Sequence, residues 1–282
     1  IYEKKDSAMV TDKPYAVKIF TKDSMFISAD RFLSYQKLDS NNVKKSYLRA
    51  YNKARVYKTN LQARADSISF NESDGELHLL KNPMVWSGAK QISGDEIKVY
   101  MNTQTEEIDS VKVIGNAFAI SKADSLNMKD EFNQIKGKYM VVYFEKGQIT
   151  TAKAVGNAQA IAYADNTNNK TKVVERIGVS ISVCGEISAN FIEKKVEEVA
   201  CSIGAQTDIY PMSMISKQQR FYQDFNWNTK DRPQKWTDIF LDTPNYEEVI
   251  YESDNLLYDK AEELRRKEEE KNKPKTPIRI KR

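Results

Sequence analysis

The sequence predicts an all-β protein built from stacked antiparallel strands, followed by one C-terminal α-helix. Short runs of alternating apolar and polar residues recur between turn signals along most of the chain, which is typical of strands and hairpins. The eight letters VIGNAFAI at 113–120 return almost unchanged as AVGNAQAI at 154–161. From residue 243 onward the pattern becomes helical and rich in charge. A repeated motif without His, Cys or paired acids indicates repeated architecture and not repeated chemistry.

Two half-motifs alternate through the predicted sheet, residues 1–219. One begins with a small and a polar residue and then alternates; the other alternates and closes on a small or turn-prone pair. The first kind is found in ADRFLSY (29–35), ADSISF (65–70), GDEIKVY (94–100), GKYMVVYF (137–144) and GEISANF (185–191). The second is found in SYLRAYNKARVY (46–57), LHLLKNPMVW (77–86), VKVIGNAFAI (111–120), AKAVGNAQAI (152–161) and VACSIGAQT (199–207). This alternation predicts an elongated stack of hairpins of near-equal width, with glycines at bends or bulges.

The composition excludes several classes of function. The 282 residues include 44 Lys and Arg and 40 Asp and Glu, for a net charge of +4, which is too balanced for a protein that neutralises nucleic-acid phosphates. No apolar run approaches the roughly 18–20 residues of a membrane-spanning helix. One His and two Cys are too few for a His/Cys zinc site. We therefore expect no metal, no cofactor and no nucleic acid.

The residues that could support catalysis are scattered. His78 lies on the strand face opposite Leu77 and Leu79, so we interpret it as a solvent-facing histidine and not as a general base. Asp30, Asp66 and Asp95 recur at strand starts, where a structural turn acid is a better interpretation than a calcium ligand. The sequence does not predict an enzyme.

The two cysteines test the hairpin register. If Gly185 pairs near Gly204, Cys201 faces Ser188 and lies roughly 13 Å from Cys184 along a straight strand. Because the Cα atoms of a disulfide lie within about 7 Å of each other, this register predicts two free, buried thiols. A different register would allow a bridge.

The apolar face of the predicted sheet has two interpretations. It could fill itself as an ordinary sandwich core, or it could line an open groove that holds lipid. Small residues would leave room for a ligand in the second case; they lie at 115, 117, 119, 154, 156, 158 and 160. Burial of ten CH₂ groups of an acyl chain would contribute about 8 kcal/mol without any side-chain chemistry.

The C-terminal part of the chain differs from the sheet. Residues 220–242 are aromatic-rich and irregular, and we expect them to cap the end of the sheet. Thr243 and Pro244 mark the start of a helix over 243–273, before a basic tail at 274–282. Its apolar stripe could plug the end of the sheet or bind a partner, and consists of Tyr246, Val249, Ile250, Leu257 and Leu264.

The order of these motifs resembles a known family. The run ARADSISFNESDGELHLLKNPMVWSGAKQISGDEIKVYMNTQTEEIDSVKVIGNAFAI (63–120) is similar to the OstA family, which includes LptA and the periplasmic part of LptD. The similarity continues through DEFNQIKGKYMVVYFEKGQITTAKAVGNAQAIAYA and YPMSM, and FNWNTKDRP looks like the OstA-like proteins of Bacteroidota. The resemblance covers about residues 20–240.

The resemblance implies an elongated OstA-type β-jellyroll in the periplasm, with an apolar groove for the acyl chains of lipopolysaccharide. It also implies head-to-tail pairing of edge strands with other transport-bridge or outer-membrane translocon subunits. The inward positions that it assigns to the lipid groove are Phe32, Ile68, Phe70, Ile97, Val99, Val111, Val113, Met140, Val142, Ile187 and Phe191. The alternative is a non-catalytic assembly subunit that docks proteins through its sheet edge and C-terminal helix.

Overall fold

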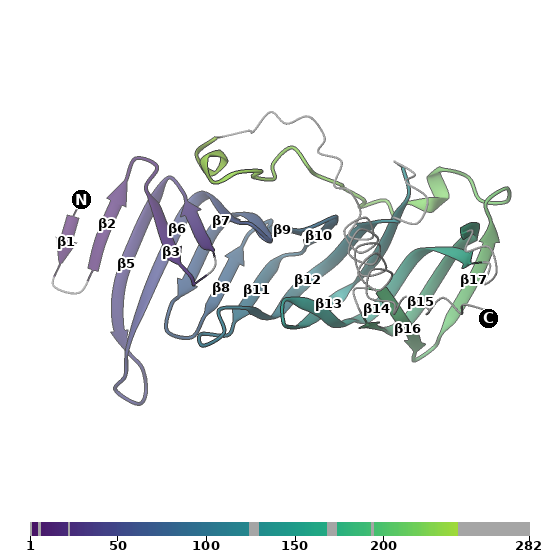
Figure 1. Cartoon of the computed structure of the whole chain (residues 1–282), viewed down its shortest axis with the longest axis horizontal. Coiled ribbons are helices and arrows are strands. Elements are labelled where there is room, and N and C mark those ends of the chain that lie inside the picture. The colour runs from purple at the N-terminus through teal and green to yellow at the C-terminus, as the bar shows by residue number, and fades with distance from the viewer. Residues whose placement is uncertain are drawn as a thin grey trace, which may run out of the picture. The chain divides into compact units, whose positions relative to one another are not determined.

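The structure is a computed structural model that describes residues 2–4, 7–21, 23–123, 130–167, 174–192 and 195–241. All of them belong to one compact unit, Ile1–Val249. They form a single 17-stranded sheet in which neighbouring strands are antiparallel (Figure 1), which confirms the predicted all-β class. In these ranges no helix is long and apolar enough to span a membrane. The predicted helix 243–273 and the tail 274–282 lie outside the described residues.

Each long strand is interrupted near its middle, along a line that we call the corner. The interruptions fall between β2 (Ser7–Thr11) and β3 (Tyr15–Ile19), β4 (Ser24–Ser28) and β5 (Arg31–Leu38), β8 (Glu76–Leu80) and β9 (Met84–Ser87), β10 (Lys90–Ser93) and β11 (Glu96–Met101), and β16 (Lys195–Ser202) and β17 (Gln206–Pro211). They fall inside β6 (Lys44–Lys58), β7 (Leu61–Asn71), β12 (Ile108–Lys122), β13 (Phe132–Glu145), β14 (Gln148–Thr167) and β15 (Val174–Ile192). The short β1 (Tyr2–Lys4) pairs with β2.

The repeated Gly-Asn of the sequence lies at this corner. Gly115 and Asn116 both have positive φ, and the same left-handed pair recurs at 52–53, 81–82, 156–157 and 203–204. Asp95, directly before the neighbouring strand β11, donates its backbone N–H to the Gly115 carbonyl at 2.9 Å. A Cβ on Gly115 would lie 2.2 Å from the Asp95 carboxylate, so a larger residue would displace that side chain and would be strained at the positive φ. The two half-motifs are therefore the two sides of one bulged corner.

The corner divides the sheet into two half-sheets. The bare half-sheet consists of β1, β2, β5, residues 44–51 of β6, 67–71 of β7, β8, β11, 108–114 of β12, 139–145 of β13, 148–155 of β14, 186–192 of β15, and β16. The covered half-sheet consists of β3, β4, residues 54–58 of β6, 61–65 of β7, β9, β10, 117–122 of β12, 132–136 of β13, 158–167 of β14, 174–184 of β15, and β17. One apolar core cluster draws residues from both halves, so their inner faces are packed against each other.

The covered half-sheet is named for the segment on its outer face. Residues 212–241, which we call the strap, leave the edge strand β17 and return across the sheet to the opposite edge strand β3, where Phe240 packs on Tyr15 at 5.5 Å between ring centroids. The strap includes the 3-10 helices η2 (Gln218–Arg220) and η3 (Trp236–Phe240). The segment is irregular and aromatic, and it lies along the outer face of the covered half-sheet. The cap over the sheet end that was expected for residues 220–242 stays a prediction.

Buried glutamines hold the strap in place. Gln134 donates to the Arg220 carbonyl and accepts from the Tyr222 N–H, at 2.8 and 3.1 Å. Gln91 likewise donates to the Asn226 carbonyl at 2.6 Å and accepts from the Asn228 N–H at 2.8 Å. Both side chains are at most 1% exposed. An irregular segment that covers a sheet needs such partners for its backbone, because those groups would otherwise be buried unpaired.

The prediction of two free thiols is wrong, because Cys184 and Cys201 form a disulfide with Cα atoms 5.8 Å apart. Cys201 faces Ile187, one position from the expected register. On a flat strand Cys184 would lie about 10 Å farther along. The strand instead folds over at Gly185, which bonds the positive-φ residue Ile203, and brings the two cysteines together across the corner.

Candidate functional site

The interior between the half-sheets contains ten of the eleven positions assigned to the lipid groove. Phe32, Ile68, Phe70, Ile97, Val99, Val111, Val113, Met140, Val142 and Ile187 all belong to the one core cluster and are at most 7% exposed. Phe191, near the end of β15, is half-buried and lies outside that cluster. Ten of the positions assigned by the resemblance therefore lie on the inner face of the bare half-sheet, while the lipid-binding role of these residues stays a prediction.

The middle of this interior is filled by the protein's own side chains. Leu77, Leu79 and Ile97 of the bare half are fully buried, and so are Val56 and Ala63 of the covered half. The small residues that were expected to leave room, such as Ala117 and Ala158, are also fully buried. They accommodate bulky side chains of the same cluster, so the inner walls are in contact here.

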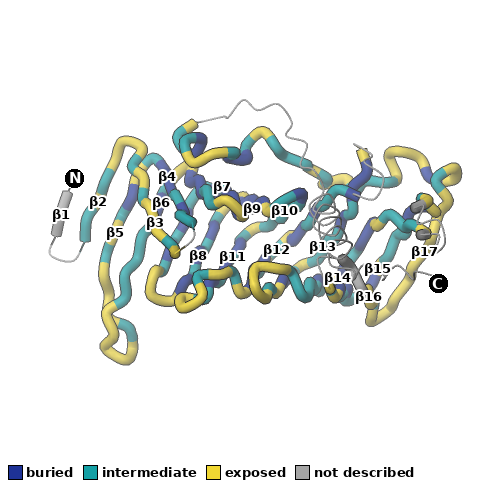
Figure 2. Tube along the Cα trace, in the orientation of Figure 1, coloured by how far each residue is buried: buried dark blue, intermediate teal, exposed yellow. Residues whose placement is uncertain are grey.

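The interior changes character toward the C-terminal edge of the sheet. Ala160 and Ala162 of β14 pair with Ser182 and Ser180, and Ser180 pairs in turn with Ile209 of β17. These inner positions are small, and Ile209 is 62% exposed. Figure 2 shows buried stretches concentrated in the middle strands and exposed ones along β17 and the hairpin tips. The apolar interior is thus filled in the middle, and its lining is smaller and more exposed at this end.

A cavity lies along the mouth, which we define as the side of the interior opposite the corner. It has a volume of about 390 Å³ and is lined from both half-sheets. Phe20 and Lys58 come from the covered half, and Met101, Ile108 and Phe144 from the bare half. Phe20, Met101, Ile108 and Phe144 are apolar. Met101 belongs to the core cluster, and the other three pack against it. The cavity therefore connects solvent with the apolar interior.

Two polar contacts cross the mouth. The Glu106 carboxylate, in the turn between β11 and β12, accepts the backbone N–H of Thr21 at 2.6 Å. The Lys18 ammonium of β3 pairs with Glu72, in the turn between β7 and β8, at 2.5 Å. The Thr21 N–H donates to the ionised carboxylate and so lowers the pKa of Glu106 below its usual value. These contacts join the free ends of the two half-sheets. They were not found from the sequence, because the turn NTQTEE gives no sign of a partner 85 residues away.

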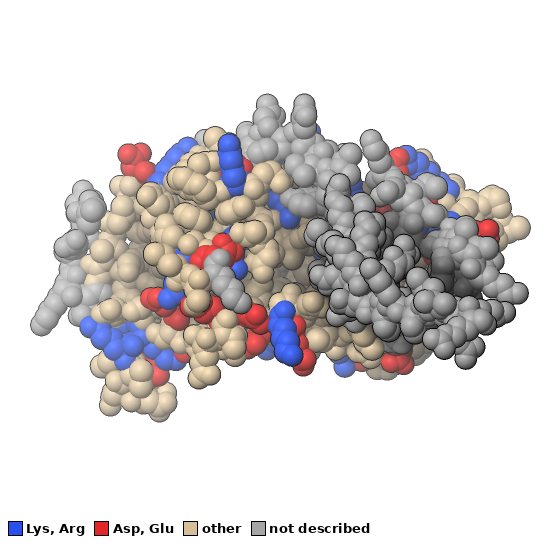
Figure 3. All heavy atoms as spheres, in the orientation of Figure 1, with Lys and Arg blue, Asp and Glu red and all other residues tan. Residues whose placement is uncertain are grey.

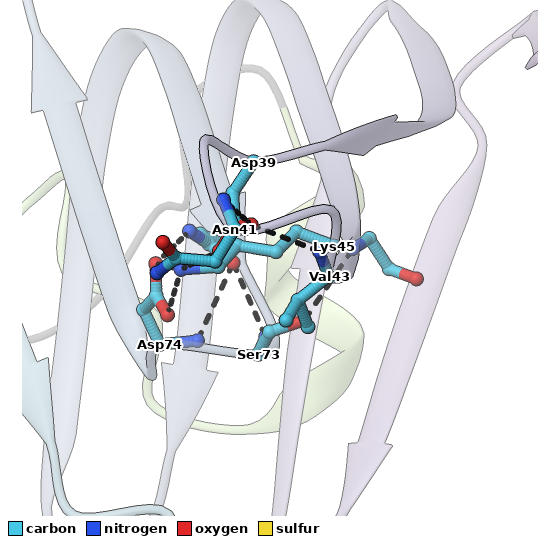
Figure 4. Close-up of polar contacts among 8 residues, drawn as sticks. Asp39, Asn41, Val43, Lys45, Ser73 and Asp74 are labelled. Atoms are coloured by element: carbon cyan, nitrogen blue, oxygen red, sulfur yellow. Dashed lines mark hydrogen bonds and ion pairs between the residues drawn. The ribbon is translucent and has the colours of Figure 1, made fainter.

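Neighbouring tips of the bare half-sheet are also held together by charge (Figure 4). Asp39 accepts the backbone N–H groups of Val43 and Asn41 at 2.9 and 2.8 Å, and both bonds lower its pKa. Lys45 donates to Asp74 of the next tip at 2.6 Å, and that bond raises the pKa of Lys45. Figure 3 shows basic and acidic side chains intermingled on this face of the molecule. The rim of the bare half-sheet is therefore polar and solvated.

Several other titratable residues take part in contacts within the sheet. His78, on the outer face of β8, lies 3.1 Å from the Glu96 carboxylate and is half-buried. Asp95 accepts the Asn116 side chain at the corner at 3.1 Å. Arg176 is buried between Glu131 and Asp165 on the covered half-sheet. Among the described residues, no group of three or more His, Cys, Asp or Glu could hold a metal ion. The predicted partner-binding residues Tyr246, Val249, Ile250, Leu257 and Leu264 lie outside the described ranges.

Comparison with known proteins finds similarity over part of the chain. Residues 4–105 match the family described as LptA/(LptD N-terminal domain) LPS transport protein. The resemblance inferred from the sequence is confirmed over that range, and over 106–240 it stays a prediction. No curated protein matches the chain. The crystal structure of LptH, described as the LptA homologous periplasmic component of the lipopolysaccharide transport device from Pseudomonas aeruginosa, aligns with 54% of this chain and 95% of its own, at 12% identity and a TM-score of 0.39.

Proposed function

We propose that this protein is a non-catalytic lipid-transfer bridge of lipopolysaccharide transport, which carries acyl chains between its two half-sheets. The observation that carries the proposal is one apolar core, held between half-sheets that share a corner on one side and meet through polar contacts on the other. Burial of an acyl chain in such an interior would contribute about 0.8 kcal/mol per CH₂ group. The family match over residues 4–105 supports the same substrate.

The filled middle of the interior fits this proposal as an unloaded form. A hydrophobic interior without ligand lowers its free energy by bringing its own walls together. The half-sheets then separate at the mouth when lipid enters, with the corner as the hinge. The lipid would then pass to the next carrier at the end beside Ile209, which is exposed.

The compartment that we propose is the periplasm. The disulfide between Cys184 and Cys201 supports this location, because disulfides persist in oxidising compartments and are rare in the cytosol. The partners in this proposal are lipopolysaccharide and other transport-bridge or outer-membrane translocon subunits, which would add to the exposed sheet edges.

Photo-crosslinking tests the lipid path. A photoreactive amino acid at Ile97 or Val142, on the inner face of the bare half-sheet, should form adducts with lipopolysaccharide in living cells. Lys98 is the matched control, since it neighbours Ile97 on the same strand and points to the outer face. Adducts at Lys98 with none at Ile97 and Val142 would exclude the interior as the path.

A second candidate is an assembly subunit that docks proteins through its sheet edge. The observation in its favour is β17, which is exposed at every residue and pairs with β15 on one side. Deletion of residues 244–282 separates a docking role of the predicted helix from an end-plug role. The sheet should stay folded in either case, while loss of complex formation in a pull-down would indicate docking.

A further inference from the structure

We propose that the cavity at the mouth is a gated entry site for a single fatty acyl chain, and that Glu106 is its gate. This inference rests on the proposed function, because it assumes that acyl chains enter the interior. It adds where they enter and which contact controls entry.

The lining of the cavity determines the chemical class of its ligand. Its apolar surface comes from Phe20 on one half-sheet and from Met101, Ile108 and Phe144 on the other, and it continues into the core cluster. A linear hydrocarbon tail can therefore follow the surface inward, and the tail needs no polar partner there.

The outer part of the cavity suits a polar head at the end of that tail. Asp23, Lys58 and Glu106 line it together with Asn60 and Gln104. The Lys58 ammonium lies 3.1 Å from Asp23 and 5.5 Å from the centre of the Phe20 ring. This cation lies at the boundary between the polar rim and the apolar surface, beside the carboxylate of Asp23.

Glu106 lies across this entrance in a conformation that is held by several bonds. Its φ is 60°, a left-handed value that is unfavourable for a residue with a side chain. The Glu106 N–H donates to the Asn102 carbonyl at 2.8 Å. The side-chain oxygen of Asn102 accepts the backbone N–H groups of Gln104 and Thr105 at 2.9 Å each. The turn thus fixes the backbone of Glu106, whose carboxylate bonds Thr21 on the other half-sheet. Opening of the entrance between these residues requires that this bond break.

Stopped-flow binding of cis-parinaric acid, a fluorescent fatty acid, to the full chain tests the gate. Glu106→Ala removes the acceptor, so we expect the association rate to rise about fivefold. Glu106→Gln keeps an oxygen acceptor for the Thr21 N–H and should stay within about twofold of the wild type. A Thr21→Cys/Glu106→Cys pair joined by a short bismaleimide should slow association at least about tenfold, because the entrance can no longer widen.

The cavity itself is tested by filling it. Ile108→Trp should weaken binding of the fatty acid at least about fivefold, whereas Asp109→Trp, at the next and exposed position, should leave it unchanged. The urea midpoint of each variant shows whether it is folded, and the cross-linked pair tests the gate even if Ile108→Trp does not fold.

The outcomes separate the gate from the function. Binding by the wild type at a rate that Glu106→Ala, Ile108→Trp and the cross-link all leave unchanged would overturn the entry site and leave the lipid-bridge proposal intact. Absence of fatty-acid binding by the wild type and every variant would overturn both. Faster binding by Glu106→Gln as well as by Glu106→Ala would contradict the role of the hydrogen bond to Thr21.

Discussion

The two half-sheets share strands and differ in what their outer faces contact. The outer face of the covered half-sheet lies under the strap, where Trp86 is fully buried and Phe118 and Phe132 pack on strap aromatics. The outer face of the bare half-sheet carries charged and aromatic pairs in solvent, such as Lys98 with Glu76 and the stacked rings of Tyr35 and Tyr47. One half is therefore buried on both faces and the other on its inner face.

This difference suits a carrier whose interior must open. The covered half-sheet is tied to the strap from edge to edge and should keep its shape, because its packing and hydrogen bonds are spread over both faces. The bare half-sheet has no such support on its outer face among the described residues. We expect it to be the half that moves when lipid enters.

The largest expected effect comes from the packing of the strap. Trp86→Ala in β9 should cost about 3–5 kcal/mol in the free energy of unfolding, because it empties a closed site and leaves the Asn228 carbonyl without its indole donor. Tyr100→Ala is the matched change on the bare half-sheet, where the ring is half-buried under the Lys112 ammonium, and should cost about 1 kcal/mol. Urea unfolding measures both, and equal losses would show that the two outer faces do not differ.

The disulfide joins the two half-sheets at one end of the corner. Its removal by Cys184→Ala/Cys201→Ala should lower the free energy of unfolding by about 3 kcal/mol, as for a closed loop with a sequence separation of 17. Unfolding in urea with and without reductant provides the check. Reduction should destabilise the wild type by the same amount and leave the double variant unchanged; a reductant effect on the variant would refute this explanation.

The glutamines under the strap should give a smaller loss. Gln134→Ala leaves the Arg220 carbonyl and the Tyr222 N–H buried without partners, and should cost about 1–3 kcal/mol. Gln36→Ala on the bare half-sheet, where the amide is exposed, should change stability by less than about 0.5 kcal/mol. Thermal unfolding of the two variants distinguishes them, and a neutral Gln134→Ala would mean that water replaces the lost bonds.

The smallest effect is a local one at the rim of the bare half-sheet. The pKa of Asp39 is lowered by the N–H groups of Val43 and Asn41, so the turn is stabilised above the ordinary pKa of an aspartate and loses that support as pH falls through the lowered value. Amide hydrogen exchange of Val43, corrected for its intrinsic pH dependence, should therefore accelerate on acidification in the wild type. In Asp39→Asn the corrected rate should not depend on pH over that range.

The alternation of the sequence was sufficient for the inner face. In EIKVYM (96–101) every second residue is apolar, and the structure buries Ile97 and Val99 in the core. The outer face of the covered half could have been recognised from the same kind of pattern, since Met84, Val85 and Trp86 are consecutive and all buried. Such a continuous apolar run is typical of a strand that is covered on both faces.

What the sequence determined by itself is therefore the β class, the hairpin repeat and the inward residues, because strand periodicity acts between near neighbours along the chain. Tertiary structure decided the path of the strap, the Cys184–Cys201 bridge, and the contact between Thr21 and Glu106. Each of these depends on how sharply the sheet folds at its corner. That fold brings together residues that are far apart in the sequence, and the local pattern around one does not predict the other.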